Sequence, residues 1–122
     1  MPRTKPALLA LAALAIAAVA VPAAAGDQAV RQVEAKYVCM VNNAVFDKEQ
    51  IPVEVDGKTY YGCCQMCKKA LNEKAELRVA VDPVSGKEVD KAKSVIAALA
   101  DGSVLYFENA GNLQKYREKS AE

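Results

Sequence analysis

The chain of 122 residues contains no histidine and no tryptophan. Without an imidazole, a Ser-His or Cys-His catalytic pair and a His-ligated metal centre are excluded. Gly-rich phosphate loops, paired catalytic carboxylates and serine nucleophile motifs are also missing, so we expect a binding protein and not an enzyme. The formal net charge is only +1, which lacks the basic field that nucleic acid or an anionic membrane surface requires.

The N-terminus is also free of acidic side chains, the first of which is Asp27. Arg3 and Lys5 precede an apolar run over residues 7–21, and small alanines follow it. A charged start, a short apolar middle and a small-residue exit are the three parts of a secretory signal. We therefore expect residues 1–25 to be a signal helix for export to the periplasm or the extracellular space. The run is short for a membrane span of about 20 apolar residues, so no stable membrane anchor is expected.

All four cysteines follow this segment, at positions 39, 63, 64 and 67. In an oxidising compartment, four cysteines are compatible with two disulfides that staple a structural or interaction domain. Cys64-Gln65-Met66-Cys67 is also a C-x-x-C sequence, which is typical of thiol–disulfide redox proteins when it begins a helix in a βαβ setting. A third interpretation, a soft-metal site, is favoured by the arrangement of the segments that carry the thiols.

A lead-in helix is expected over residues 26–36, which mix Val30 and Val33 with charged side chains. Residues 37–77 then form a first unit. Its centre is a β-hairpin, because alternating apolar residues flank Asp56-Gly57, a strong two-residue turn signal.

The helix of this first unit is expected over residues 68–77, directly after the cysteines. A second unit, residues 78–122, repeats the order without thiols. Asp101-Gly102 follows Asp56-Gly57 by 45 residues, and the same offset places Glu108 on Cys63 and Asn112 on Cys67. We therefore predict a small α+β domain of two pseudo-repeated β-hairpin–helix (ββα) units after an N-terminal signal helix.

The thiols of the first unit lie where a strand is followed by a helix. Positions i and i+3 or i+4 share a helix face, so either Cys63 or Cys64 can converge with Cys67. The hairpin can fold Cys39 onto the same point. Thiolates without imidazole favour Cu(I), with Zn(II) next, and the thioethers of Met40 and Met66 are auxiliary candidates.

One cysteine, a hairpin with Tyr60-Tyr61, and then Cys63-x3-Cys67 resemble the TRASH and YHS domains. These domains are linked to heavy-metal trafficking, resistance and sensing. The resemblance implies that Cys39, Cys63 and Cys67 are the metal ligands, with Cys64 as an extra thiol. It also implies a second unit that has lost its ligands, and a metal transporter or metalloenzyme as the client partner. The expected function is exported binding of a soft metal ion, with Cu(I) favoured.

Overall fold

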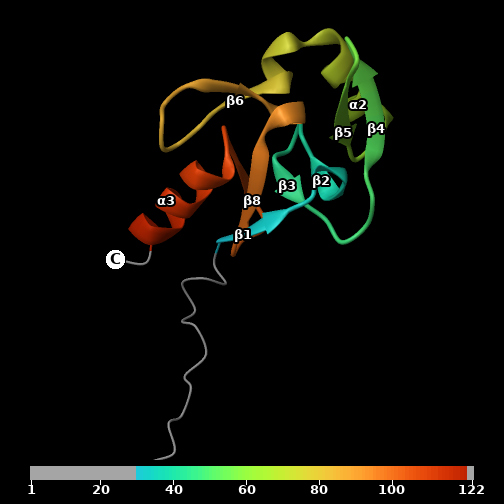
Figure 1. Ribbon diagram of the computed structural model, residues 1–122. Helices are drawn as coiled ribbons and strands as arrows, with labels where there is room; N and C mark the ends of the chain where they lie inside the picture. Colours follow the sequence, from blue (N-terminus) through green and yellow to red (C-terminus); the bar gives the residue numbers. More distant parts are fainter. Residues whose placement is uncertain (1–29, 121–122) are drawn as a thin grey trace, which may run out of the picture.

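The computed structural model describes residues 30–120, so the expected signal helix and residues 26–29 lie outside the described part of the chain. Figure 1 shows the path of the chain. The described residues form strands, two α-helices and three short 3-10 helices (η). In chain order the described elements are β1 (Val30–Val33), η1 (Ala35–Tyr37), β2 (Val38–Cys39), β3 (Ala44–Val45), β4 (Ile51–Val55), β5 (Lys58–Gly62), α2 (Gln65–Glu73), η2 (Ala75–Arg78), β6 (Val79–Val81), β7 (Glu88–Asp90), η3 (Lys91–Lys93), β8 (Val95–Leu99), β9 (Val104–Phe107) and α3 (Ala110–Ser120).

The largest sheet has the antiparallel order β1-β8-β9 and is covered on both faces. Ile96 and Ala98 of β8 belong to the main hydrophobic core, whereas Ala97 packs in a second cluster with Phe107 and Leu113 of α3. A strand buried on both faces is nearly continuously apolar, which explains the sequence Val-Ile-Ala-Ala-Leu of β8. The sheet therefore separates α3 from the rest of the protein.

The first hairpin, β4–β5, carries α2 on its surface. Its turn is made by Asp56 and Gly57 at φ +52° and +78°, the left-handed values that a two-residue hairpin turn requires, and the turn prediction is confirmed. Helix α2 buries Leu71, and the guanidinium of Arg78 donates 2.8 and 3.3 Å hydrogen bonds to the carbonyls of Leu71 and Asn72 near its C-terminus.

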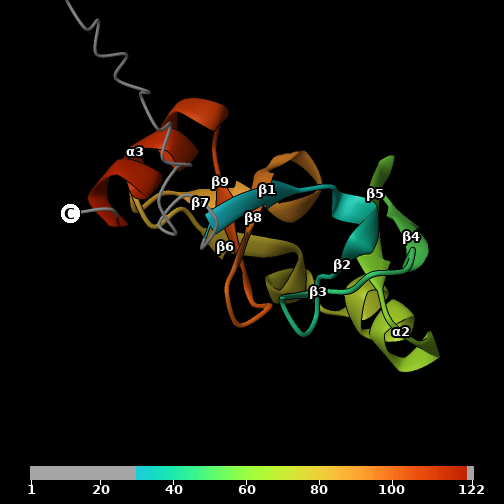
Figure 2. The same cartoon turned by 90° about the horizontal axis from the view of Figure 1, so that it is seen from below.

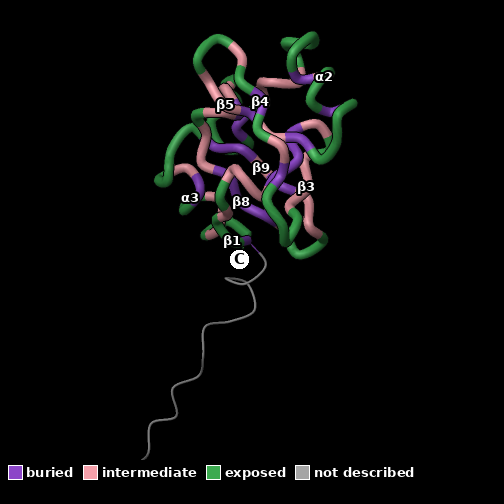
Figure 3. Tube along the Cα trace, turned by 90° about the vertical axis from the view of Figure 1, so that its right-hand side faces the viewer, coloured by how far each residue is buried: buried purple, intermediate pink, exposed green. Residues whose placement is uncertain are grey.

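The two helices lie at opposite ends of the molecule, α2 with the first hairpin and α3 with the three-stranded sheet (Figures 1 and 2). A single core joins these ends, because Val53, Tyr60 and Leu71 of the first hairpin and α2 pack with Ile96 and Tyr106 of the sheet. In Figure 3 the buried parts of the tube run through the strands, while the turns between them are exposed.

The lead-in helix expected over residues 26–36 is wrong in its described part. Residues 30–33 form β1, which pairs with β8 from Val30↔Leu99 to Val33↔Ile96, and a short 3-10 turn follows. The physical reason for a strand here is that both faces of the sheet are covered, one by the main core and the other by the cluster near α3. In a strand, residues three apart point to opposite faces, so Val30 reaches the cluster near α3 while Val33 packs against the main core.

The α+β class is confirmed, with two helices and several small antiparallel sheets in residues 30–120. The pseudo-repeat stays a prediction. Each hairpin has an Asp-Gly pair at its turn and is followed by a helix, but Gly102 alone takes a positive φ in the second, longer turn. The second hairpin is also joined by β1, whereas β4 and β5 form a sheet of two strands. Neither α2 nor α3 is long and apolar enough to cross a membrane.

Candidate metal centre

Three cysteines from separate segments meet at one corner of the fold. Cys39 ends β2, Cys63 directly follows β5, and Cys67 lies in the first turn of α2. Their sulfur atoms all lie within 4.8 Å of one another, with 3.8 Å between Cys39 and Cys67 and 3.6 Å between Cys63 and Cys67. These three cysteines are close enough to bind a metal ion.

The spacing of the sulfurs fits the size of a metal–thiolate centre. With a metal–sulfur bond of about 2.3 Å, two sulfurs around one ion lie about 3.8 Å apart in tetrahedral geometry and about 4.0 Å apart in trigonal geometry. The separations of 3.6 and 3.8 Å match those values, whereas a disulfide needs about 2.0 Å, and all four cysteines are free thiols. Two of the three sulfur separations therefore lie near those of a metal–thiolate centre.

Cys39 reaches this corner through hydrogen bonds between distant backbone segments. The N–H of Met40 donates to the carbonyl of Tyr61 at 2.8 Å, which holds the end of β2 beside β5. Val38, Cys39 and Met40 are completely buried. The core thus anchors the segment that supplies the most buried thiol.

Gly62 permits the close approach of Cys67 to β5. A Cβ at position 62 would lie only 2.7 Å from the Cβ of Cys67, closer than real side chains come. Gly62 is buried, and Cys67 is 8% exposed. The absence of a side chain at this position therefore places Cys67 against the strand end that carries Cys63.

The surroundings shift the thiol pKa values in opposite directions. Burial raises the pKa of Cys39, but the backbone N–H groups of Asn42, Val41 and Cys63 outweigh it, so the pKa of Cys39 falls below its usual value. Burial raises the pKa of Cys67 to about 12, and hydrogen bonds with neighbouring thiols add to this effect. In the metal-free protein, Cys39 is the buried thiol best prepared to ionise, and Cys67 is held neutral.

The exposed thiols also differ. The hydrogen bond with Cys67 lowers the pKa of Cys63, but the bond with Cys39, desolvation and the charges of Cys39 and Cys64 outweigh it and leave this pKa raised. The pKa of Cys64 is lowered, chiefly by the backbone N–H of Cys67 at the start of α2. An ion that binds thiolates must displace protons from these groups, so metal affinity should increase with pH.

Two polar neighbours of the cluster were not anticipated from the sequence. The Asn42 amide donates to the Cys63 sulfur at 3.5 Å. Lys91 is buried, and its ammonium donates to the carbonyl of Met40 at 2.7 Å and to Asn43 Oδ1 at 2.9 Å. Asn42 lies only three residues after Cys39, so its position near the cluster could have been inferred from the sequence. Lys91 lies 51 residues from Met40, and no sequence pattern indicates that it lies near the cluster.

The other sulfur-bearing residues occupy unlike places. Met40 is part of the hydrophobic core, and Met66 is 80% exposed. Cys64 is exposed, and its sulfur lies 3.6 Å from that of Cys67. The C-x-x-C pair thus lies at the start of a helix, but every strand pair in residues 30–120 is antiparallel, unlike the βαβ setting of redox C-x-x-C motifs.

The strand-to-helix corner after β9 contains a buried carboxylate. Asp82 is completely buried, and its Oδ2 accepts hydrogen bonds from the Glu108 N–H at 2.8 Å and from the Asn112 amide at 2.9 Å. Its Oδ1 accepts from the N–H groups of Val84 and Ser85. A hydrogen-bonded side chain therefore links the strand and the helix at this polar corner.

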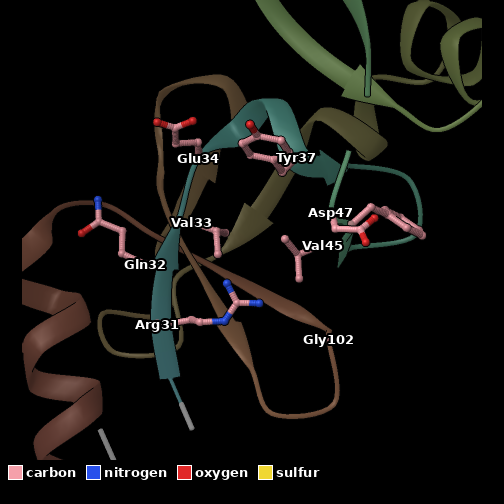
Figure 4. Close-up of a pocket in the computed structure, with 9 residues that line it drawn as sticks. Arg31, Gln32, Val33, Glu34, Tyr37, Val45, Asp47 and Gly102 are labelled. Carbon is pink, nitrogen blue, oxygen red and sulfur yellow. The ribbon is translucent and has the colours of Figure 1, made fainter. Parts of the chain in front are cut away.

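A pocket of about 600 Å³ lies away from the cysteines. Figure 4 shows it beside β1, with Arg31, Gln32 and Val33 of this strand among the residues that line it. Val45 of β3 and Gly102 of the β8–β9 turn form its opposite side. No cysteine lines this pocket, so the pocket and the cysteine cluster are separate features of the protein.

The corner formed by β2, β5 and α2 belongs to the class of cysteine clusters able to hold a metal ion. Comparisons of the chain with protein-family models, with curated proteins and with solved structures give no significant match. The resemblance to TRASH and YHS domains therefore rests on the cysteine spacing and the hairpin, and the geometry of the sulfurs is the main guide to function.

Proposed function

We propose that this protein is an exported soft-metal-binding protein that holds Cu(I), or Zn(II) less preferably, through Cys39, Cys63 and Cys67. Its role is to buffer, carry or sense the ion, or to give resistance to it, and not to catalyse a reaction. A metal transporter or a metalloenzyme is the expected client. The observation that carries the proposal is the convergence of three sulfurs within 4.8 Å from segments up to 28 residues apart.

The donor atoms support a soft ion. The cluster consists of sulfur alone, the sequence contains no imidazole, and no carboxylate from residues 30–120 joins the group. Thiolates select Cu(I), Zn(II) and heavier soft ions over hard cations such as Mg²⁺ and Ca²⁺. Structural zinc normally has four protein ligands, whereas three thiolates suit trigonal Cu(I), which is why Cu(I) is preferred here.

Export is supported by the residues before the described part of the chain, where Arg3, Lys5 and the apolar run 7–21 have the composition of a signal peptide. In the exported chain, removal of Arg3 and Lys5 changes the net charge from +1 to −1. Neither value offers the basic field of a nucleic-acid-binding protein.

Competition titration of the reduced protein with a chromophoric Cu(I) chelator tests the proposal. We expect one Cu(I) per chain, and a loss of affinity of more than about 100-fold in Cys67→Ser, because even residues that only support a metal ligand contribute about 10–100-fold. Cys64→Ser is the matched control, since its thiol lies outside the three-sulfur group. Equal affinity of the wild type and Cys67→Ser would refute the proposal. Tighter binding of Zn(II) than of Cu(I), measured against the appropriate chelators, would reverse the metal preference.

A further inference from the structure

Among the four cysteine sulfurs, that of Cys67 lies at the centre and the other three surround it. It lies 3.8 Å from the sulfur of Cys39 and 3.6 Å from those of both Cys63 and Cys64. Cys39 and Cys67 are buried, whereas Cys63 and Cys64 are exposed. The cluster therefore consists of a buried pair, Cys39 and Cys67, and two exposed sulfurs that lie equally far from the sulfur of Cys67.

Only one of these exposed sulfurs, that of Cys63, belongs to the compact group of three. Cys64 is the N-cap residue of α2, yet its side chain makes no capping hydrogen bond. The Cys67 N–H lies close enough to lower the pKa of this thiol, but no capping hydrogen bond fixes the sulfur at the start of the helix. A cysteine side chain turns about the single χ1 bond, so this sulfur can change position while the backbone stays in place.

Two static roles fit Cys64 poorly. As a permanent fourth ligand it would have to share one ion with its direct neighbour Cys63, which is an awkward geometry for adjacent residues. As a helix cap it makes no bond. Its sulfur lies as close to that of Cys67 as the sulfur of Cys63 does, so rotation about χ1 can bring it to an ion held by Cys67.

We propose that Cys64 is the exchange thiol of this centre, which replaces Cys63 as the outer ligand and passes the ion to an acceptor that presents thiolates of its own. This inference rests on the proposed function and adds a route of release to it. Cys39 and Cys67 keep the ion until the acceptor has formed its first bond, because both are buried, whereas Cys63 and Cys64 are exposed.

The exchange is a substitution of ligands without electron transfer. The metal–sulfur bond to Cys63 breaks and one to Cys64 forms, while the proton released by the Cys64 thiol passes through solvent to the Cys63 thiolate. In the second exchange a thiolate of the acceptor replaces Cys64. The next thiolate of the acceptor then takes the ion from Cys39 and Cys67, and the three released thiolates regain protons from solvent. Met66, two residues after Cys64 and in the first turn of α2, leaves an apolar side chain 80% exposed for the approach of the acceptor.

Stopped-flow transfer of Cu(I) from the loaded protein to a synthetic Cys-x-x-Cys peptide tests the exchange. Equilibrium affinity is measured on the same proteins with a chromophoric chelator. Cys64→Ser and Cys64→Ala are both used, since serine is a good N-cap and alanine a poor one. A common effect then belongs to the lost sulfur and not to the helix start. Gln65→Ser is the control, an exposed neighbour in the first turn of α2 without sulfur.

We expect both Cys64 variants to keep the wild-type affinity within about threefold and to transfer Cu(I) at least tenfold more slowly, while Gln65→Ser matches the wild type. Unchanged transfer rates in both variants overturn the exchange role alone. A tenfold or greater loss of affinity in both would make Cys64 a resident ligand and also overturn it. If the wild type binds Cu(I) no better than Cys67→Ser, the proposed function itself fails, and the exchange role fails with it.

Discussion

Gly62→Ala is the sharpest test of how the fold places the cysteine centre. The new Cβ would lie 2.7 Å from the Cβ of Cys67, which is about 0.7 Å short of the 3.4 Å at which ordinary contact begins. It would also lie 3.3 Å from the carbonyl carbon of Cys67 and 3.4 Å from the N atom of Lys68. Because backbone atoms of α2 are involved, a rotation of one side chain cannot relieve the clash, and the start of the helix must move.

This movement has two consequences of different kinds. Overpacking a buried position costs about 1–3 kcal/mol of stability. A shift of about 0.7 Å in Cys67 also exceeds the tolerance of about 0.2 Å in metal–ligand distances, so we expect Cu(I) affinity to fall about 10–100-fold. Urea denaturation of the reduced, metal-free protein measures the first effect, and competition titration with a Cu(I) chelator measures the second.

Gly57→Ala provides the matched control. At φ +78° an alanine is strained, but its Cβ would meet nothing within 4 Å. We expect a loss of about 1–2 kcal/mol from the left-handed backbone, with wild-type Cu(I) affinity. If Gly62→Ala loses stability to the same degree and still binds Cu(I) like the wild type, the packing of β5 against Cys67 does not set the centre, and our reasoning is refuted.

Further predictions concern the polar corner and the core. Hydrogen bonds from Asn112 and from backbone N–H groups outweigh the burial of Asp82 and lower its pKa to about 2, compared with 3.8 for the free group. The contribution of the ionised Asp82 carboxylate to the stability of the protein is therefore complete above about pH 4 and is lost as the pH falls through 2. Urea titrations at pH 5 and pH 2 should show about 2 kcal/mol of acid destabilisation in the wild type that Asp82→Asn lacks, and equal pH dependence of both proteins would contradict this. Leu71→Ala empties a completely buried site on the same face of α2 as Cys67 and should cost about 2–5 kcal/mol in the reduced, metal-free protein; a loss below 1 kcal/mol would mean that α2 is not anchored by this residue.

Local patterns predicted the elements whose conformation depends on near neighbours. The turn at Asp56-Gly57 has the positive φ values that its sequence signals. The helix expected in the second unit is α3, and the side chain of Asn109 caps it by accepting a 2.8 Å hydrogen bond from the Asn112 N–H. In both places residues a few positions apart supply the interaction, so the sequence is sufficient to reveal it.

Patterns failed where distant segments decide the outcome. The spacing of Val30 and Val33 fits a helix face, but pairing with β8 converts this segment into a strand. Helix α2 was expected from residue 68 and begins at Gln65, because the chain turns into the helix directly after Gly62 and the two exposed cysteines. Tertiary pairing and packing contribute more than local propensity in such short elements.

The sequence by itself determined the chemistry of the site: thiols without imidazole, placed on both sides of a hairpin, and close in spacing at a strand-to-helix corner. Those properties depend only on residue type and short spacing. The tertiary structure alone decided that Cys39 arrives within 3.8 Å of Cys67, that Gly62 makes room for the helix, and that Lys91 lies buried beneath the loop after β2. The physical reason is that these contacts join segments up to 51 residues apart, and only burial in a common core brings such segments together.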